Sequence, residues 1–300
     1  MGTRGVKSLL LITCSSKKGD TKQYSTYIDL SNIESRGSNL RKAILVAMAE
    51  EEPFSRIKSE IYPRLTEYYS DHGYETFFVY GRKQKPWERN LRRKLEALRW
   101  NSFYPILRLY DFFALWIYKF SSPDCSLYEK NISVDVPEDI RHLSTKMLSA
   151  LFLLNDLGYE IVIRTTVSSI LLPEVIDITL AKADLTKAIY GGRINNQADG
   201  FTYTSGSLTV FNNKSIEILK SQKTKIDLSL IDDVAIGKFM IKQKILPSIS
   251  FNFLDVKNEN ALVSFGTEKD IAQIRCKSEG RAEDRFDSAL MKSAIEMLKI

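Results

Sequence analysis

The chain has 300 residues, of which 44% are hydrophobic and 27% are charged, and its formal net charge is +6. This composition is ordinary for a folded domain, and the lack of repeats and low-complexity tracts excludes solenoid and low-complexity classes. The three cysteines are widely spaced and only two histidines are present, which disfavours a zinc motif, a His-rich metal site and a Ser/His/Asp hydrolase. Any catalysis is therefore expected to use carboxylates.

The first predicted element is a buried strand at residues 6–14. This apolar run is too short for the core of a signal peptide or for a membrane-spanning helix. A polar loop follows at 15–38, and Asn39 is expected to cap a helix over 40–51. We expect a cytoplasmic location, with the inner membrane surface as the alternative.

Two further elements follow in the chain. Residues 53–71 have helical character with a break near Pro63, and Gly73 suits the end of this helix. Residues 74–80 read Tyr-Glu-Thr-Phe-Phe-Val-Tyr, which predicts a strand that ends at Gly81.

The net positive charge is concentrated in one segment, residues 82–99. Its acids are Glu88 and Glu96, and its basic residues are Arg82, Lys83, Lys85, Arg89, Arg92, Arg93, Lys94 and Arg99. The segment carries 8 − 2 = +6 charges, so the rest of the chain is neutral on balance. This local patch opens a helical insertion that we expect at about 82–122.

An aromatic and aliphatic segment follows at residues 100–120, and its role together with the basic segment stays open. Its apolar length falls short of the roughly 20 residues needed to cross a bilayer. A basic helix beside an aromatic one could lie on an anionic membrane surface, with the rings at the level of the headgroups. The alternative is a solvated basic helix followed by a core helix. Nucleic-acid binding is disfavoured because no recognised binding module accompanies the patch.

The second half of the sequence alternates helical and strand-like segments. A helix is expected over 137–158, with apolar residues at helical spacing, and a central strand over 159–165. The remaining elements are predicted helices at 173–183, 212–221, 232–242 and 284–298 and predicted strands near 188–190, 201–210 and 248–254. Together these elements predict one α/β domain over 1–300, with a mixed, mostly parallel sheet flanked by helices.

Three segments of this half resemble the motifs of a known enzyme family. They are 139–150, which contains Leu-Ser-Thr-Lys; 200–210, which contains Tyr-Thr-Ser-Gly; and 232–237, which reads Asp-Asp-Val-Ala-Ile-Gly. Their order and spacing resemble the inverting GT-A glycosyltransferases of the galactosyltransferase and Fringe type, over about half of the chain. The resemblance implies a GT-A (Rossmann-like) fold. It also implies transfer of a sugar from a nucleotide-diphosphate sugar, with a UDP-sugar favoured, to a hydroxyl of a glycan or lipid-linked acceptor.

The resemblance assigns the catalytic base to Asp233, with Asp232 binding the acceptor or capping the helix. The acceptor hydroxyl must lose its proton as it attacks the anomeric carbon, so a carboxylate must lie within hydrogen-bond reach. Taken alone, two acids before an apolar helix would indicate a helix cap; the three segments together favour the transferase. One base without a covalent intermediate implies inversion. The residues expected to wall the acceptor pocket are Tyr203, Ser205 and Gly206.

The expected donor site departs from the family pattern after the strand at 159–165. Where the family has Asp-x-Asp, this chain reads Arg-Thr-Thr-Val-Ser-Ser, so no metal ligand is assigned. A divalent metal, Mn²⁺ or Mg²⁺, stays an open alternative. This segment either contacts the donor directly or only ends a strand and forms a turn. The residues assigned to donor binding here are Arg164, Thr165, Thr166 and Ser168.

Two other segments complete the expected donor site. Ligands of open α/β sheets bind at the carboxyl ends of the strands, so the end of the strand at 6–14 should face the nucleotide through Thr13, Cys14 and Ser15. Lys277 belongs to a basic cluster that could clamp the diphosphate in place of a metal, or form surface charge only. A degenerate transferase that binds a glycan or a nucleotide without turnover is the alternative function.

Overall fold

A computed structural model describes residues 40–49, 51–83, 113, 115–196, 201–263, 270–278 and 286–300. The chain divides into two compact units, Met1–Asn39 and Leu40–Ile300, and every described residue belongs to the second. The strand expected at 6–14, with Thr13, Cys14 and Ser15, lies outside the described residues. Most of the insertion expected at 82–122 also lies outside them.

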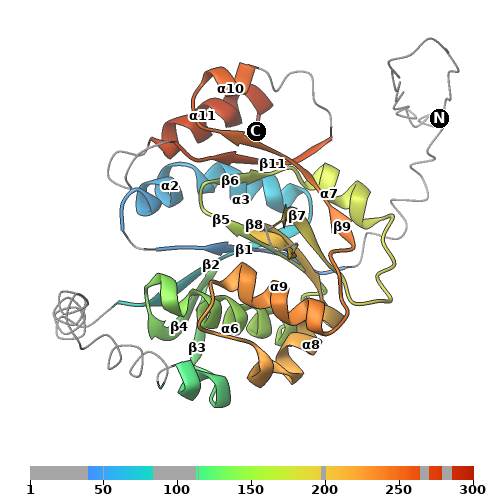
Figure 1. Cartoon of the computed structure of the whole chain (residues 1–300). Coiled ribbons are helices and arrows are strands. Elements are labelled where there is room, and N and C mark those ends of the chain that lie inside the picture. Colours follow the sequence, from blue (N-terminus) through green and yellow to red (C-terminus); the bar gives the residue numbers. More distant parts are fainter. Residues whose placement is uncertain are drawn as a thin grey trace, which may run out of the picture. The chain divides into compact units, whose positions relative to one another are not determined.

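The second unit contains a large mixed sheet (Figure 1). Its eight strands lie in the order β3 (Cys125–Tyr128), β4 (Asn131–Pro137), β2 (Tyr74–Arg82), β1 (Lys42–Ala47), β5 (Ile161–Thr166), β8 (Thr202–Asn212), β7 (Tyr190–Asn196) and β9 (Ile249–Ser250). The four central strands β4, β2, β1 and β5 are parallel. β3 and β8 pair antiparallel at the two sides of this parallel centre. The expected α/β class with a mixed sheet is confirmed.

A smaller sheet extends one side of the unit. It has the strand order β10 (Asn252–Val256), β11 (Ile271–Cys276) and β6 (Ser169–Leu171). β10 and β11 are parallel, whereas β11 and β6 are antiparallel. The predicted strand at 248–254 is therefore two strands, β9 and β10, which belong to different sheets.

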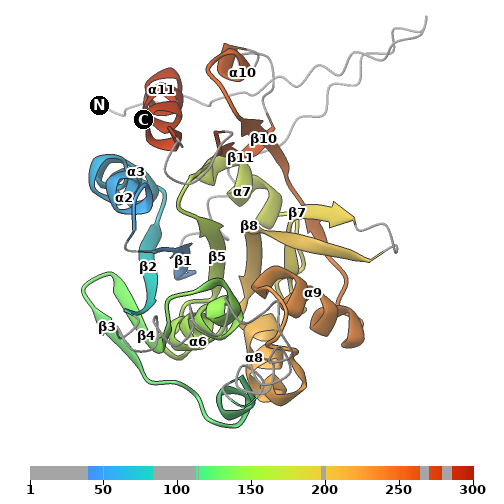
Figure 2. The same cartoon turned by 60° about the vertical axis from the view of Figure 1, so that its left-hand side comes forward.

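Helices cover both faces of the large sheet (Figure 2). The core on one face includes residues of α2 (Phe54–Glu60), α3 (Tyr62–Asp71), α7 (Pro173–Leu180) and α11 (Asp287–Leu298), of which α11 contacts α2 and β11. The other packs against α6 (Leu143–Asp156), α8 (Asn213–Ser221) and α9 (Asp232–Lys242). The short helices are η2 (Ile140–His142), η3 (Lys223–Lys225) and α10 (Asn260–Val263). Side chains of β1 alternate between these two cores, because successive residues of a strand face opposite sides: Ile44 and Val46 enter one, Ala43 and Leu45 the other.

The predicted helix at 40–51 is wrong, because the segment forms the central strand β1. Residues 43–46 read Ala-Ile-Leu-Val and are at most 1% exposed. A parallel strand buried on both faces is a continuous apolar run, which periodicity alone cannot distinguish from a buried helix segment. The other predicted helices correspond to α2 with α3, α6, α7, α8, α9 and α11. The break expected near Pro63 lies at Ile61, between α2 and α3.

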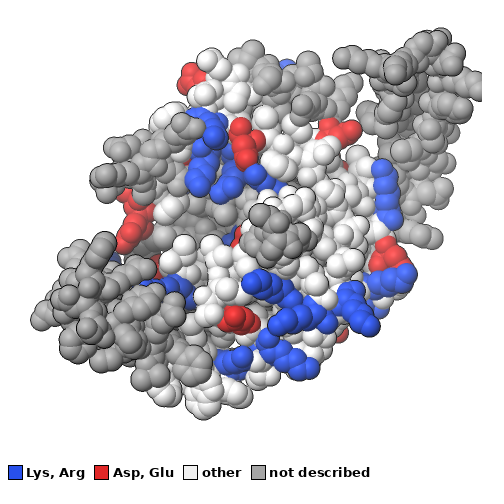
Figure 3. All heavy atoms as spheres, in the orientation of Figure 1, with Lys and Arg blue, Asp and Glu red and all other residues white. Residues whose placement is uncertain are grey.

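The charge of the described surface is unevenly spread. Figure 3 shows Lys and Arg side chains gathered over α8 and α9. These two helices contribute Lys214, Lys220, Lys238 and Lys242, all of them exposed. A surface of this sign attracts anionic ligands.

Within the described residues, none of the helices has the length and apolar character needed to cross a membrane.

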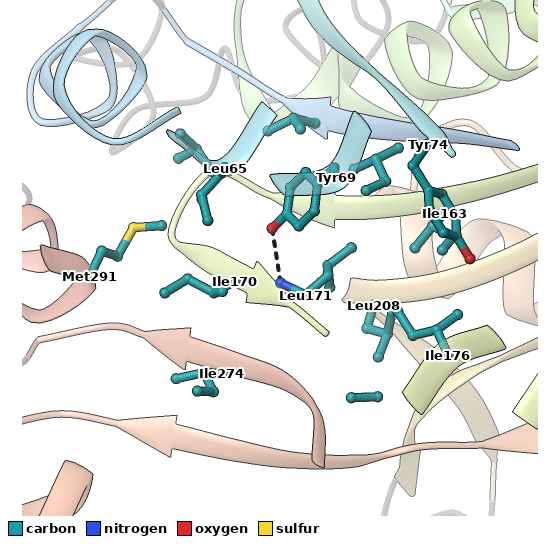
Figure 4. Close-up of a cluster of buried hydrophobic side chains, with 14 of the residues drawn as sticks. Leu65, Tyr69, Tyr74, Ile163, Ile170, Leu171, Ile176, Leu208, Ile274 and Met291 are labelled. Atoms are coloured by element: carbon teal, nitrogen blue, oxygen red, sulfur yellow. Dashed lines mark hydrogen bonds between the residues drawn. The ribbon is translucent and has the colours of Figure 1, made fainter. Parts of the chain in front are cut away.

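One buried hydrogen bond links α3 to the smaller sheet (Figure 4). The backbone N–H of Leu171 on β6 donates to the hydroxyl of Tyr69 on α3 at 2.9 Å. Tyr69 is 1% exposed and Leu171 is fully buried, so water cannot replace this contact. The tyrosine hydroxyl therefore accepts the hydrogen bond of a buried backbone N–H in the core that also contains Ile44 and Val46 of β1.

Replacing this hydroxyl tests the packing of the two sheets. Tyr69→Phe should lower the free energy of unfolding by about 1–3 kcal/mol, because it leaves a buried backbone N–H without an acceptor. Tyr68→Phe is the matched control, since Tyr68 is the preceding residue on α3 and its hydroxyl donates to Glu174, whose side chain is 52% exposed. Urea denaturation of both variants measures the difference. Equal effects of the two substitutions would contradict the role given to Tyr69.

Candidate active site

The three segments that carry the family resemblance meet at the start of α9. Arg164 lies on β5, which follows the first of these segments in the chain. It forms an ion pair with Asp232, with 2.5 Å between Arg164 Nη2 and Asp232 Oδ2. The backbone N–H of Gly206 on β8 donates to Asp233 Oδ2 at 3.0 Å. The hydroxyl of Ser144 on α6 donates to the backbone carbonyl of Leu230, in the loop before α9, at 2.5 Å. Segments far apart in the sequence thus form one site.

Asp232 is buried together with its cationic partner. Its side chain is 3% exposed and that of Arg164 is 7% exposed, so both charges are removed from water. Burial raises the pKa of the Asp232 carboxyl, and the Arg164 guanidinium opposes this shift. The N-cap residue of α9 is Ile231. The ion pair therefore anchors the start of α9, where Asp232 lies, to β5.

Arg164 is likewise placed inside the protein. Its Nε and Nη1 have no hydrogen-bond partner among the described residues. Gly206 lies directly against the guanidinium, and a Cβ at this position would overlap Nη1. The glycine of the Tyr-Thr-Ser-Gly segment is therefore required for Arg164 to reach Asp232. Arg164 therefore supports the acids at the start of α9 from inside the protein.

Asp233 differs from Asp232 because it is only half-buried. Its Oδ1 accepts from the backbone N–H of Val234 at 2.8 Å, while Gly206 binds Oδ2. Two backbone donors thus fix the direction of the carboxylate. The cavity beside it, which Arg164 also lines, has a volume of about 10 Å³. This space holds about one water molecule.

Close packing explains why the Asp-Asp-Val-Ala-Ile-Gly segment ends in a glycine, Gly237. A Cβ at Gly237 would lie 2.5 Å from the Cβ of Tyr203 and 3.2 Å from the hydroxyl of Tyr190. The glycine therefore lets α9 approach β7 and β8 closely. Tyr203, expected at the acceptor pocket, stacks on Phe201, with ring centroids 5.2 Å apart.

Ser205 and Thr165 belong to a buried polar network between the two sheets. The Ser205 and Ser207 hydroxyls are 3.0 Å apart and hydrogen bonded, and Thr165 Oγ1 donates to the Ser207 carbonyl at 2.8 Å. Gln273 on β11 donates through Nε2 to Ser169 Oγ and to the same carbonyl, at 3.0 and 2.5 Å. The polar groups of these residues are thus hydrogen bonded within the network. The hydroxyls of Ser205 and Thr165 are thus hydrogen bonded inside the protein, next to the candidate site.

Three of the residues assigned to donor binding line one pocket at the carboxyl ends of β1 and β5. Thr166, Ser168 and Lys277 surround a volume of about 260 Å³, together with Met48 and Ala49, which follow β1. Val167 and Ser168 form the turn between β5 and β6, so the turn interpretation also applies to this segment. The sequence thus identified one edge of this pocket, whereas the contribution of β1 was missed.

A second pocket, of about 920 Å³, adjoins the first at Met48 and Ala49. Residues that end β2, from Tyr80 to Lys83, line its far side, and Lys58 of α2 enters it. Lys58 Nζ donates to Tyr80 Oη and to Asn131 Oδ1, both at 2.6 Å, and burial lowers its pKa. The carboxyl ends of parallel strands are where open α/β sheets bind ligands.

A buried lysine positions the strand ends that line both pockets. Lys146, the lysine of Leu-Ser-Thr-Lys, is 2% exposed, and its Nζ donates to the Met48 carbonyl at 2.9 Å and to Glu138 Oε1 at 2.5 Å. Glu138 Oε2 in turn accepts from the backbone N–H of Gly81. Burial lowers the pKa of Lys146, and Glu138 opposes this shift. Sequence reasoning missed this contact, although a lysine among the apolar residues of a helix was a signal for it.

The described residues contain no group of three or more His, Cys, Asp or Glu side chains placed to hold a metal ion. The side chains of Lys277 and Arg275 line the pocket of about 260 Å³, and that of Lys58 lines the pocket of about 920 Å³. No protein-family model matches the chain, and a search of curated proteins found no similar sequence.

Breaking the buried ion pair should cost more than breaking a surface pair. Asp232→Asn leaves the Arg164 guanidinium buried without a carboxylate, and we expect the free energy of unfolding to fall by about 3–5 kcal/mol. The control is Asp156→Asn, which removes the partner of Lys220 at a site where both side chains are exposed; its effect should stay below about 1 kcal/mol. Urea denaturation compares them, and a small equal loss for both would contradict the anchoring role of Asp232.

Replacing Lys146 should loosen the carboxyl ends of β1 and β2, which line the two pockets. Lys146→Met removes a charged donor from Met48 and leaves Glu138 without its cation, so amide exchange at 46–49 and 79–81 should accelerate by at least about tenfold. Lys42→Met is the matched control, because Lys42 binds Asp177 from the opposite end of β1, with 2.9 Å between Nζ and Oδ2. Hydrogen exchange followed by mass spectrometry measures the exchange rates in both variants. Unchanged protection in Lys146→Met would refute the positioning role.

Proposed function

We propose that the protein is a GT-A glycosyltransferase that moves a sugar from a nucleotide-diphosphate sugar to an acceptor hydroxyl with inversion. A UDP-sugar is the favoured donor, and a glycan or a lipid-linked saccharide at the cytoplasmic membrane surface is the favoured acceptor. One observation carries the proposal. Three separate segments converge on two adjacent carboxylates, of which Asp232 is neutralised by Arg164 and Asp233 alone stays partly exposed. An exposed carboxylate on a fixed support is what a general base requires.

Asp233 is the base in this proposal. It accepts the proton of the acceptor hydroxyl as the oxygen forms its bond to the anomeric carbon, and the bond from that carbon to the diphosphate breaks. A carboxylate has about four lone-pair directions, so the backbone donors of Gly206 and Val234 leave acceptor capacity for this proton. The single displacement inverts the anomeric carbon. Arg164 does not touch the substrate; it holds the helix start that carries Asp233.

The donor occupies the two pockets at the carboxyl ends of β1, β2 and β5. The leaving diphosphate gains negative charge, which must be neutralised by groups already in place. Lys277 and Arg275 lie beside Thr166 and Ser168 and supply positive charge there. A divalent cation bound with the donor would serve the same purpose. In this proposal Thr166, Ser168 and Lys277 bind the diphosphate, and Asp233 faces the acceptor.

A second candidate function is binding of a nucleotide or glycan without turnover. The observation that favours it is the small cavity beside Asp233, with room for about one water molecule and not for a sugar ring. The transferase proposal requires this space to open when the donor binds. The two functions therefore differ in whether the Asp233 carboxylate reaches a bound sugar.

Asp233→Asn tests the base directly. The amide keeps the size of the side chain but cannot take up the proton, so turnover should fall by about 10²–10⁴-fold while donor affinity stays within about threefold of wild type. The control is Asp227→Asn, an exposed acid in the loop before α9. Sugar transfer over a panel of nucleotide sugars, with Mn²⁺ or with EDTA, gives turnover, and calorimetry gives donor affinity.

Near wild-type turnover of Asp233→Asn would show that another group is the base. Donor binding by the wild-type protein without transfer or donor hydrolysis in every assay would instead establish the second candidate function.

A further inference from the structure

Seven lysines lie on the surface formed by α8, η3 and α9, where Figure 3 shows a group of basic side chains. They form the lysine patch, which consists of Lys214, Lys220, Lys223, Lys225, Lys238, Lys242 and Lys244. Between residues 213 and 244, the acids outside the candidate site are Glu217 and Asp227. This surface therefore carries 7 − 2 = +5 charges.

The lysine patch is continuous, because the ends of the two helices adjoin. Gln222, at the end of α8, donates through Nε2 to Gln243 Oε1, at the end of α9, at 3.2 Å. Lys220 and Lys223 lie on either side of Gln222 in the chain, and Lys242 precedes Gln243. Cations from both helices therefore share one surface.

Most of these cations are not neutralised by the protein itself. In the part of the chain that the structure describes, only Lys220 of the patch pairs with a carboxylate, that of Asp156. On another surface, by contrast, Lys187 pairs with Asp184. The carboxyl end of a helix carries roughly half a negative charge, so the two helix ends offset only about one of the excess charges. The remaining positive charge attracts an anionic partner.

The lysine patch includes the helix that carries the proposed base. Lys238 and Lys242 follow Asp233 on α9 and lie about 7.5 Å and about 13.5 Å farther along the helix axis, at a rise of about 1.5 Å per residue. Lys238 Nζ lies 5.8 Å from the centroid of the Phe201 ring, and this ring stacks on Tyr203, the residue expected at the acceptor pocket. The positive charge thus begins within two helical turns of the Asp233 carboxylate.

This continuity distinguishes the partner. An acceptor whose reacting hydroxyl lies at Asp233 extends over the neighbouring surface, and acidic groups along it meet the lysines of α9. A bilayer or a nucleic acid would use the charge of the patch, but neither requires its connection to a catalytic carboxylate. A saccharide chain with acidic groups matches both the charge of the patch and its position.

We infer that the acceptor is an acidic saccharide chain, whose carboxylate or phosphate groups bind the lysine patch while its terminal hydroxyl lies at Asp233. The inference rests on the proposed function and names the class of its acceptor. Because the lysines are exposed, their attraction for the chain is screened by salt. The binding itself requires no sugar transfer, so it can be measured separately from turnover.

Equilibrium binding of two saccharides that differ only in charge tests the inference. The probes are octagalacturonate, which carries one carboxylate per unit, and its full methyl ester, which carries none. Calorimetry with the full chain should show the acid binding at least about tenfold more tightly than the ester at low salt, and the difference should vanish near 1 M salt, where the Debye length is about 3 Å. The variant K225A/K238A/K242A should lose at least about tenfold in affinity for the acid, because it removes three exposed ion pairs of modest individual strength.

The control is K182A/K187A/K292A, which removes three exposed lysines of other surfaces and should bind the acid within about twofold of the wild type. Circular dichroism checks that both variants fold, and the comparison of acid with ester in the wild type needs no variant. Three results would overturn the inference: equal or no binding of acid and ester, equal losses in the two variants, or tighter binding of anionic vesicles or duplex DNA than of octagalacturonate.

Sugar transfer separates this inference from the proposed function. Transfer to neutral acceptors without charge-dependent binding would overturn the acidic acceptor and leave the transferase. Binding of octagalacturonate that depends on the lysine patch, without transfer to any acceptor, would contradict the transferase and support the patch as a saccharide-binding surface.

Discussion

The candidate site depends on one buried ion pair, between Arg164 on β5 and Asp232 at the first turn of α9. Removing two charges from water costs several kcal/mol per ion, and only close mutual contact offsets this cost. The pair is therefore a strong constraint on geometry, because neither partner can move away without leaving the other uncompensated. It fixes where α9 begins. The neighbouring carboxylate of Asp233 is held, as a consequence, at the edge of the same cluster, partly open to solvent.

Two glycines are consequences of this constraint. The guanidinium of Arg164 lies against the backbone of Gly206, where a side chain would displace it, and α9 packs so closely on Tyr203 that only Gly237 fits. The family-like motifs are thus explained by packing as much as by chemistry. Lys146 adds a second support from α6, since it holds the ends of β1 and, through Glu138, of β2. The Asp233 carboxylate and the two pockets are therefore positioned by buried charged side chains.

The sequence predicted the elements that have a clear period and clear ends. Helix α6 begins shortly after Glu138 and Asp139, and α9 begins with Asp232 and Asp233. Both helices carry apolar residues at helical spacing, and β5 follows a helix that ends near Gly158. β1 was missed because a strand buried on both faces has no period. β4 could have been predicted, since Asn131–Pro137 alternates buried and exposed positions strictly.

The site was predicted in part. Asp233, Thr166, Ser168 and Lys277 were identified as candidates, and the structure places the last three in one pocket. The partner of Arg164 could not be predicted, because sequence spacing contains no information on which residues of β5 and α9 face each other across the core. For the same reason, Thr165 and Ser205 resembled ligand contacts, while their hydroxyls bond within the buried network.

The proposed function requires a donor nucleotide at the carboxyl ends of β1 and β5, with its sugar in reach of Asp233. A crystal structure with a bound nucleotide-diphosphate sugar tests this requirement. We expect the diphosphate beside Thr166, Ser168 and Lys277 and the anomeric carbon in an opened cavity facing Asp233. A nucleotide bound elsewhere, or a donor at this edge with the cavity at Asp233 still closed, would contradict it.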